Sequence, residues 1–337
     1  MQPALLTIIL NFRTPDMTLR AAETALREMA DLSGEVLVID NGSGDDSFEV
    51  MQREAQDRGW LSNNRFRLIS SDHNGGFGAG VNIGLRARMS DGRRPDYYYL
   101  LNSDAFPEPG AVRILLEFLT SNPQAGMAGS YIRGVDGEPH RTAFRFPSIA
   151  GEFEAAAKTG VFSRLLKHAI VAIEIPKNTT QVDWTAGASL MIRRDLIEKV
   201  GGFDETFFLY FEETDLCHRA RQAGWQVYYL PGSEVAHVGS ASTGMKTWDR
   251  VPQYWLDSRL HYFTKTHGRL YAAGATLSAI LGGILWRLRC MVQNKPLESP
   301  PHFLRDLMAH SVRHMFRRAP RISDEFPLST VATEDNK

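Results

Sequence analysis

The stretch Tyr97-Tyr98-Tyr99-Leu100-Leu101-Asn102-Ser103-Asp104 decides the fold that this sequence predicts. Its first five residues are aromatic or apolar and predict a buried strand, which ends at three polar residues. A loop with two prolines and an apolar-periodic helix over residues 111–119 follow. Open α/β sheets hold ligands where a strand leads through a loop into a helix, so Asp104 is a candidate ligand of a metal ion or a phosphate. The same triplet also suits an ordinary turn.

The segments on either side of this stretch alternate between strand and helix patterns. Apolar and β-branched runs predict further strands at residues 5–12, 35–39, 65–70 and 125–131. Because such alternation favours parallel pairing, we expect an α/β fold with a mostly parallel central sheet flanked by helices. The strand ends at Asn11, Asp40 and Asp104, and the loop that begins at Asn74, then lie at one edge of the sheet.

The first two strand ends carry candidates for binding a nucleotide. Asn11 and Arg13 follow the first strand, and Asp40 ends the second. Asp40 can accept hydrogen bonds from a base or a ribose, and the small residues after it allow a close approach. An N-cap for the next helix explains Asp40 equally well.

A glycine-rich segment follows the third strand. Glycines before a helix also occur in dinucleotide fingerprints, but that motif opens the first strand–helix unit and has an acid about 20 residues later. The loop from Asn74 through Gly76 and Phe77 instead suits a diphosphate, which its amides and the helix N-terminus can face. Asn82 belongs to the first turn of that helix.

The region after the predicted strand at 125–131 has a less regular pattern. Residues 132–180 mix glycine, proline and short apolar segments, and residues 152–173 are predicted to be helical. We interpret this region as a lid or an insertion that selects the acceptor. Trp184 then offers a flat face to a sugar, and the small residues Gly187 and Ala188 allow close backbone approach. Core packing is the alternative for Trp184.

An aromatic run ends in a second acidic cluster, formed by Glu212, Glu213 and Asp215. Carboxylates in the first turn of a helix also complement its dipole. An unpaired carboxylate after so apolar a stretch would be costly, however, so a pair in a partly buried cleft is a candidate general base. His237 could bind a metal beside Asp104, although a lone histidine is more often structural.

Composition narrows the class of protein. The 337 residues are 43% hydrophobic and 23% charged, as in a globular protein with a core, and the net charge of −1 gives no electrostatic case for nucleic acid. Cys217 and Cys290 are the only cysteines and form no CxxC pair, which argues against a zinc site and favours a reducing compartment. The first residues lack a basic region, so we expect no signal peptide.

Taken together, these motifs resemble the inverting nucleotide-sugar glycosyltransferases of family 2, which have the GT-A fold, and within them the bacterial rhamnosyltransferase-like enzymes of polysaccharide assembly. The resemblance covers about residues 5–265, and its motifs come in the family's order. They are residues 7–13, 38–43, 74–82, 100–104, 185–188, 202–208, 212–217 and His237.

The resemblance implies roles for individual residues. Asp40 resembles the ligand of the base or ribose, and Asn102-Ser103-Asp104 stands where the family has Asp-x-Asp. Asp104 would bind a divalent metal, Mn²⁺ or Mg²⁺, and the diphosphate, with His237 as a further metal ligand. Asn102 replaces the family's first acid, which leaves the metal one fewer anionic ligand. Glu213 aligns with the catalytic base, often Asp in the family, and Glu212 or Asp215 could share that role.

The chain changes character from about residue 247. Aromatic residues such as Trp248 alternate with basic ones, and residues 270–285 are nearly free of charge. Sixteen such residues fall short of the roughly 20 that span a bilayer. Basic flanks, and a later basic run that includes Arg317, Arg318 and Arg321, favour a membrane surface; packing on the catalytic domain or on a second subunit explains the stretch equally well.

The sequence thus predicts a catalytic domain at residues 1–246, with a donor half to about 131 and an acceptor half from 132. A helical region at 247–322 and a disordered tail at 323–337 are predicted to follow the catalytic domain. The predicted function is transfer of a sugar from dTDP-rhamnose, or from a UDP- or GDP-sugar, to a glycan or lipid-linked acceptor. The reaction would occur in the cytoplasm, at or near the inner membrane face, and homo-oligomers are compatible with it. A nucleotidyltransferase and a non-catalytic sugar-binding module remain as alternatives.

Overall fold

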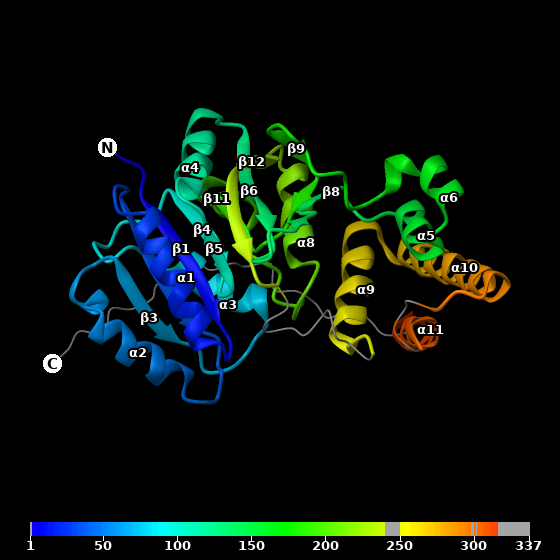
Figure 1. Cartoon of the computed structure of the whole chain (residues 1–337), viewed down its shortest axis with the longest axis horizontal. Coiled ribbons are helices and arrows are strands. Elements are labelled where there is room, and N and C mark those ends of the chain that lie inside the picture. Colours follow the sequence, from blue (N-terminus) through cyan, green and yellow to red (C-terminus); the bar gives the residue numbers. More distant parts are fainter. Residues whose placement is uncertain (1, 240–249, 298–299, 301, 316–337) are drawn as a thin grey trace.

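In the central sheet β4, which is the stretch from Tyr97, lies next to the three parallel strands β3, β2 and β1 on one side (Figure 1). On its other side the strands pair both parallel and antiparallel. The structure is a computed structural model and describes residues 2–239, 250–297, 300 and 302–315. The strand order is β3-β2-β1-β4-β11-β6-β12-β5, with β7 and β9 paired to β6 and β12. A separate pair joins β10 to β8.

The strands are β1 (Leu5–Asn11), β2 (Gly34–Asp40), β3 (Phe66–Ser70), β4 (Tyr97–Asn102), β5 (Ala105–Pro107), β6 (Ala125–Arg133), β7 (Pro139–His140), β8 (Ala143–Phe144), β9 (Thr180–Val182), β10 (Trp184–Thr185), β11 (Ser189–Arg193) and β12 (Gln226–His237). The α-helices are α1 (Pro15–Glu28), α2 (Ser47–Asp57), α3 (Phe77–Arg86), α4 (Ala111–Ser121), α5 (Ile149–Ala157), α6 (Gly160–Leu165), α7 (Arg194–Val200), α8 (Glu212–Gln222), α9 (Gln253–His267), α10 (Arg269–Gln293) and α11 (Phe303–Met315). Two 3₁₀ turns are η1 (Trp60–Ser62) and η2 (Lys167–Ala169).

Helices cover both faces of the sheet, which explains why its central strands are apolar throughout. Alternate residues of β4 join two different cores: Tyr99 packs with α1 and α4, whereas Tyr98 packs with α3, α7 and α8. The buried tyrosine hydroxyls find polar partners, since Tyr98 donates to the carbonyl of Leu85 (3.0 Å) and Tyr99 pairs with Ser189 (2.8 Å). The predicted α/β architecture is confirmed.

Two details differ from the sequence-based expectation. β11 runs antiparallel to both β4 and β6, because the chain returns to the sheet from an insertion rather than through a crossover helix. The Pro-Gly-Ser-Glu sequence of residues 231–234 is typical of a turn, but these residues lie within β12. Their Pro and Gly produce a register shift against β6 between Leu230 and Glu234, so the strand continues past an irregularity.

The insertion before β11 is less helical than predicted. Instead of one helix over 152–173, two short helices, α5 and α6, are separated at Lys158, which has a left-handed φ of 43°. The turn η2 follows them, and residues 170–179 are irregular. The break falls directly before Gly160, the first residue of α6.

The helices α9, α10 and α11 lie with α5 and α6 at the end of the molecule away from β3 (Figure 1). Arg259 of α9, only 2% exposed, joins three of them: its guanidinium donates to Glu152 of α5 (2.6 Å) and to Thr276 of α10 (3.2 Å). α11 is attached to α9 through His310, which lies 2.6 Å from Asp257. The predicted boundary at residue 247, Trp248, the basic run from Arg317 and the tail at 323–337 lie outside the described residues.

Candidate active site

A cavity of about 570 Å³ lies at the carboxyl ends of β1 and β4 and is closed by the segment before α8 and by α9. It brings together residues that the sequence analysis drew from separate motifs. The predicted residues that line it are Asn74, Gly76, Phe77, Asn102, Ser103, Asp104, Gly187, Ala188, Glu212, Glu213 and His237.

Asp104 and His237 form the polar floor of this cavity. His237 Nε2 lies 3.0 Å from Asp104 Oδ1, and the Gly239 amide donates to Asp104 Oδ2 (3.0 Å). Burial opposes ionisation of Asp104, but the hydrogen bonds outweigh it and its pKa lies below the ordinary value. Asn102 Nδ2 lies 3.4 Å from the same histidine nitrogen. These three side chains come from β4, the residues after it and the end of β12, which the sheet brings together.

This group of donors suits a divalent cation. Two neighbouring ligands of an octahedral ion with bonds of about 2.1 Å lie about 3 Å apart, which matches the distance between Asp104 and His237. Rotation of the Asn102 amide would turn its oxygen toward the same point. The residues present therefore fit a metal ion of the Mg²⁺ or Mn²⁺ type.

Glu213 and Glu212 begin α8 at another part of the cavity wall. Glu213 Oε1 accepts a long hydrogen bond from the Gly187 amide (3.4 Å), and burial raises the pKa of its carboxyl. Burial, together with the neighbouring charge of Glu213, raises the pKa of Glu212 well above the ordinary value. Glu212 Oε2 is buried and has no partner in the described structure. Both carboxyls thus have raised pKa values, and Glu213 is the one that accepts from the Gly187 amide at the cavity wall.

The described residues of the cavity wall include no lysine or arginine. Three of them are acids: Asp104, Glu212 and Glu213. A diphosphate that entered the cavity without a counter-ion would be repelled by the negative charge of these acids. A divalent cation at Asp104 would make the charge at that point of the wall positive.

Asp40 and its neighbours lie behind the cavity rather than on its wall. Asp40 Oδ1 accepts from Asn11 Nδ2 (2.7 Å) and from the Ser43 hydroxyl (2.5 Å), and Asp40 is 4% exposed. Arg13 Nε donates to the Ser43 carbonyl (2.8 Å). The three predicted nucleotide ligands thus form one cluster, which holds the loops after β1 and β2 together. Asn41, next to Asp40, is the residue that reaches the wall.

Most of the glycines in the glycine-rich segment serve packing. Gly80 and Gly84 let α3 approach β1, because a Cβ there would come within 2.5 Å of Leu10 and 2.8 Å of Ile8. Only Gly76 has a φ that requires glycine, 92°, and a Cβ there would lie 2.1 Å from the Phe208 carbonyl oxygen. Gly76 therefore fixes a loop-to-loop contact at the cavity wall, and Gly80 and Gly84 allow α3 to pack closely on β1.

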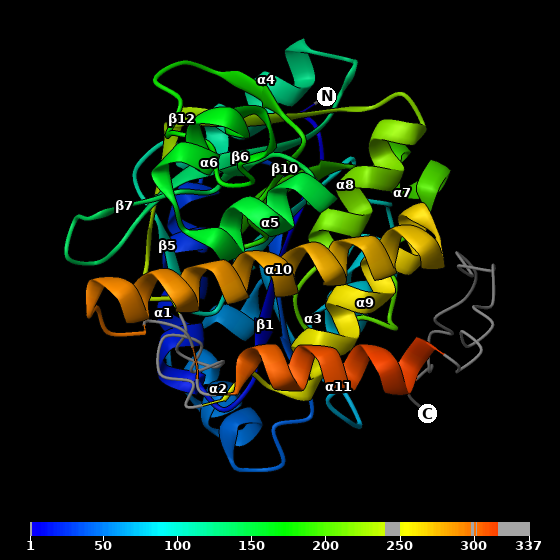
Figure 2. The same ribbon diagram turned by 90° about the vertical axis from the view of Figure 1, so that its right-hand side faces the viewer.

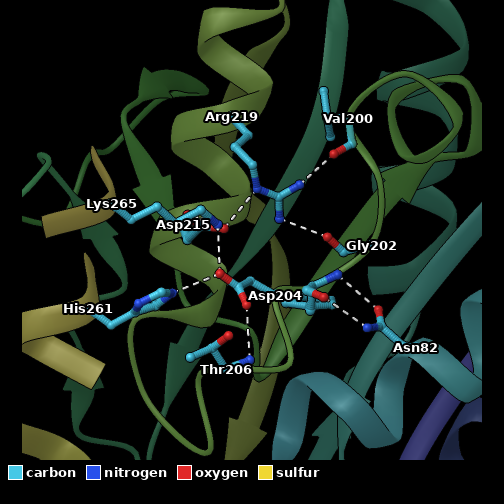
Figure 3. Close-up of polar contacts among 10 residues, drawn as sticks. Asn82, Val200, Gly202, Asp204, Thr206, Asp215, Arg219, His261 and Lys265 are labelled. Atoms are coloured by element: carbon cyan, nitrogen blue, oxygen red, sulfur yellow. Dashed lines mark hydrogen bonds and ion pairs between the residues drawn. The ribbon is translucent and has the colours of Figure 1, made fainter. Parts of the chain in front are cut away.

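Three further predicted residues lie away from the cavity. Asn82 exchanges hydrogen bonds with the backbone of Phe203 (2.9 and 2.8 Å) and fastens α3 to the loop before α8 (Figure 3). The Trp184 ring stacks on Phe144 and its indole N–H donates to the Arg145 carbonyl. These contacts agree with core packing, the alternative to a sugar platform. Asp215 faces the other side of α8, so its position gives no support to a share in the base role.

Asp215 belongs instead to a buried ion network that joins α8 to α9 (Figure 3). Lys265 Nζ lies 2.8 Å from both Asp215 and Asp204, and His261 Nε2 lies 2.9 Å from Asp204. Arg219 adds a second cation to Asp215 (2.8 Å). The two carboxylates are 2% and 7% exposed. The network fixes the helix whose first turn carries Glu213.

Sequence reasoning missed several residues of the wall: Leu10, Phe12, Asn41, Ala186, Phe208, Leu209, Tyr210 and Tyr254. Tyr210 and the adjacent Phe211 both have left-handed backbone, with φ of 68° and 70°. Each such residue costs on the order of 1–2 kcal/mol, and such strain clusters at functional sites. The aromatic run signalled this segment, but nothing in the sequence showed that Tyr254 of α9 would join it.

Comparison with known proteins adds to this geometry. Residues 7–201 match the model of the family described as glycosyl transferase family 2, which is more than half of the chain. The chain belongs to glycosyltransferase family 2. The resemblance seen in the sequence is therefore confirmed, and the protein is a glycosyltransferase.

Two relatives of this glycosyltransferase are rhamnosyltransferases. It is 32% identical over 216 residues to the N-acetylglucosaminyl-diphospho-decaprenol L-rhamnosyltransferase of Mycobacterium tuberculosis. The aligned region covers 62% of this chain and 68% of that protein. It is 27% identical over 169 residues to rhamnosyltransferase WbbL of Escherichia coli. That alignment covers 48% of this chain and 60% of WbbL.

Solved structures of other glycosyltransferases share its fold. GalNAc-T7 with UDP, GalNAc and Mn²⁺ matches with a TM-score of 0.58 and 13% identity, over 93% of this chain and 58% of that one. The mannosyltransferase PcManGT from Pyrobaculum calidifontis, in complex with GDP-Man and Mn²⁺, matches with a TM-score of 0.57 and 14% identity, over 93% and 80%. The GT-A fold predicted from the sequence is confirmed.

Proposed function

We propose that this family 2 glycosyltransferase transfers a sugar from a nucleoside diphosphate to a lipid-linked glycan, with inversion at the anomeric carbon. Rhamnose from dTDP-rhamnose is the favoured donor, and a UDP- or GDP-sugar is the alternative. The names of the two rhamnosyltransferase relatives support the sugar, and the decaprenol-linked substrate in one of those names supports the lipid-linked acceptor.

The observation that carries the proposal is the division of the cavity between two kinds of group. Asp104 and His237, a pair spaced for a cation, and Glu213, a carboxylate with a raised pKa, line the same space of about 570 Å³. A displacement at an anomeric carbon needs both functions, one for the leaving diphosphate and one for the attacking hydroxyl.

Asp104, His237 and Asn102 would hold a divalent metal ion next to the leaving diphosphate. When bound there, Mn²⁺ or Mg²⁺ neutralises the charge that develops on the leaving group. The lack of Lys and Arg in the described wall supports this assignment, because no side chain there replaces the ion. The Mn²⁺ in both structural neighbours is consistent with it.

The acceptor hydroxyl would lose its proton to Glu213. A base works best when its pKa lies near the working pH, and burial moves Glu213 in that direction. Burial raises the pKa of the adjacent Glu212 as well, and ionisation of one carboxyl of this pair disfavours ionisation of the other. The Gly187 amide at 3.4 Å orients the Glu213 carboxylate.

The reaction would take place on the cytoplasmic side of the membrane. Both cysteines, Cys217 and Cys290, are buried free thiols, which suits a reducing compartment.

A transfer assay tests the proposal. The purified protein is incubated with dTDP-rhamnose, UDP- or GDP-sugars, Mn²⁺ or Mg²⁺, and a polyprenyl-diphosphate sugar, and product is followed by mass spectrometry and its anomeric configuration by NMR. We expect metal-dependent transfer from one nucleotide class with inversion. Glu213→Gln should lower kcat about 10²- to 10⁴-fold and retain donor binding, whereas Glu117→Gln, an exposed acid on α4, should not change kcat. Unchanged turnover in Glu213→Gln would remove Glu213 from catalysis, and retention would overturn the inverting mechanism.

A further inference from the structure

The exposed large hydrophobic side chains of this protein gather at one end. Of the 16 in the described residues, 12 lie on α6, α10, α11 and the segment after α10. They are Val161, Leu165, Leu270, Leu277, Leu281, Ile284, Leu288, Met291, Val292, Leu297, Met308 and Val312. In Figure 2, which looks onto this end, α10 and α11 lie side by side at the front of the molecule. We call the surface formed by these 12 residues the apolar end.

The outer face of α10 is apolar along almost its whole length. Every exposed position from Leu270 to Val292 is Ala, Leu, Ile, Met or Val, and the large ones follow helical spacing, so they form one stripe. At 1.5 Å per residue the stripe is about 33 Å long. The surface helix of a globular protein normally shows polar residues on this side, so α10 is built for contact with an apolar phase.

The inner face of α10 is committed to the rest of the protein. Ala275, Ala279 and Gly282 are buried there, and a Cβ at Gly282 would lie 2.6 Å from the Phe153 carbonyl of α5. By length and composition alone α10 could cross a membrane, yet a third (33%) of its most apolar window is buried inside the protein. A spanning orientation would strip α10 from α5, whereas an orientation in the plane of a membrane surface keeps both faces satisfied.

Charge around the apolar end identifies the kind of membrane. Nine basic residues lie on or next to α6, α10 and α11, namely Lys158, Arg164, Lys167, Arg269, Arg287, Arg289, Lys295, Arg305 and Arg313. Within the described parts of these segments, 158–168, 269–297 and 303–315, the acid is Asp306, which Arg250 holds at 2.6 and 2.8 Å. The whole chain carries a net charge of only −1, so this basic excess is local.

The same charge argues against a second copy of the chain as the occupant. Two such ends facing each other would place like charges together, which is unfavourable. Anionic lipid head groups, in contrast, complement basic residues, and the acyl region accepts the Leu and Ile side chains of the stripe.

We propose that the apolar end docks on an anionic bilayer, with α10 lying in the plane of the interface. The inference goes beyond the proposed function and does not depend on the chemistry of the cavity. It would hold the enzyme at the surface in which a lipid-linked acceptor is anchored.

Vesicle flotation tests this proposal. The full chain is mixed with vesicles of phosphatidylcholine, or of phosphatidylcholine with phosphatidylglycerol, and its partition is measured at low and high salt. We expect flotation with the anionic vesicles, at least tenfold weaker partition in high salt, and a similar loss in the double variant Leu281→Gln, Leu288→Gln. A matched control, Leu61→Gln with Ile114→Gln, alters two exposed apolar residues on the catalytic body and should float like the unaltered chain.

Three results would overturn the proposal. The first is equal partition of the stripe variant and the unaltered chain. The second is a dimer in light scattering that the stripe variant dissociates, which would assign the surface to a second copy. The third is binding that resists extraction by carbonate, which would indicate a spanning helix. Glu213→Gln should float normally, so a failure of the proposed chemistry and a failure of docking are separable.

Discussion

Replacing Lys265 by Met tests whether α9 supports the catalytic helix. The Lys265 ammonium lies 2.8 Å from both Asp204 and Asp215, and those carboxylates are 7% and 2% exposed. Removing one partner of a buried ion pair typically costs about 3–5 kcal/mol, because the remaining charge stays buried. Asp215 keeps Arg219, and Lys265 itself is 24% exposed, so water can replace part of the contact. We therefore expect the lower end, about 3 kcal/mol.

The assay is urea denaturation followed by circular dichroism, with Arg58→Met as the matched control. Arg58 also contacts two carboxylates, Glu23 and Glu54, but all three side chains are exposed, so the control should lose less than about 1 kcal/mol. If Lys265→Met loses no more than Arg58→Met, the network is not a support of α8 and the reasoning is refuted.

The pH dependence provides an independent check. Burial opposes ionisation of Asp204, but hydrogen bonds from His261 and Lys265 outweigh it and hold the pKa of this carboxyl well below its ordinary value of 3.8. A lowered pKa stabilises the fold above the unfolded value, and that stability is lost as the pH falls through the folded pKa. The deficit of Lys265→Met should therefore persist from pH 7 to pH 5 and shrink below about pH 4. A deficit that is constant down to pH 3 would exclude an effect through the carboxylates.

Three further changes test the cavity wall. Glu212→Gln removes a carboxyl whose raised pKa makes the unaltered protein less stable as the pH rises. The free energy of unfolding of the variant, measured in urea and compared with that of the unaltered chain, should therefore increase by up to about 1.4 kcal/mol per pH unit between pH 5 and the folded pKa. A difference that does not depend on pH would show that Glu212 ionises normally. Gly76→Ala should lower the free energy of unfolding by about 3 kcal/mol or more, since it combines positive φ with a backbone clash. Gly44→Ala, which has positive φ but open space around it, should lower it by about 1–2 kcal/mol. Equal losses in the two variants would contradict the contact between the loops. Asp104→Asn should abolish the metal-dependent part of stabilisation by nucleotide in thermal shift, about 2.7 kcal/mol at 100 times the dissociation constant, and a retained metal effect would place the ion elsewhere.

The order and type of most elements could be predicted because local patterns determine them. The apolar run at 97–101 and the polar triplet after it produced β4 and the start of the cavity as predicted. The antiparallel β11 could not be predicted, because its direction depends on the path of a 55-residue insertion between β6 and β11, residues 134–188. The continuation of β12 past Pro231 could not be predicted either, since an irregularity tolerates proline where a regular ladder does not.

The site was predictable at the level of strand ends but not of side-chain direction. Asp40 ends β2 and Asp104 follows the end of β4 in the same sheet, yet Asp40 accepts from Asn11 while Asp104 lines the cavity with His237. Asp215 and Glu213 are two residues apart on one helix, which places them on different faces. Tyr254 reaches the cavity only because α9 folds back onto α8.

The network between α8 and α9 also sets an order for the folding of the chain during synthesis. Lys265 follows Asp215 by 50 residues, and at 5–20 residues per second the ribosome adds it roughly 3–10 s later. Through that interval Asp204 lacks both Lys265 and His261, and Asp215 retains only Arg219, so the burial of Asp204 in particular is unfavourable. We therefore expect α8 to reach its final packing only after α9 has been synthesised.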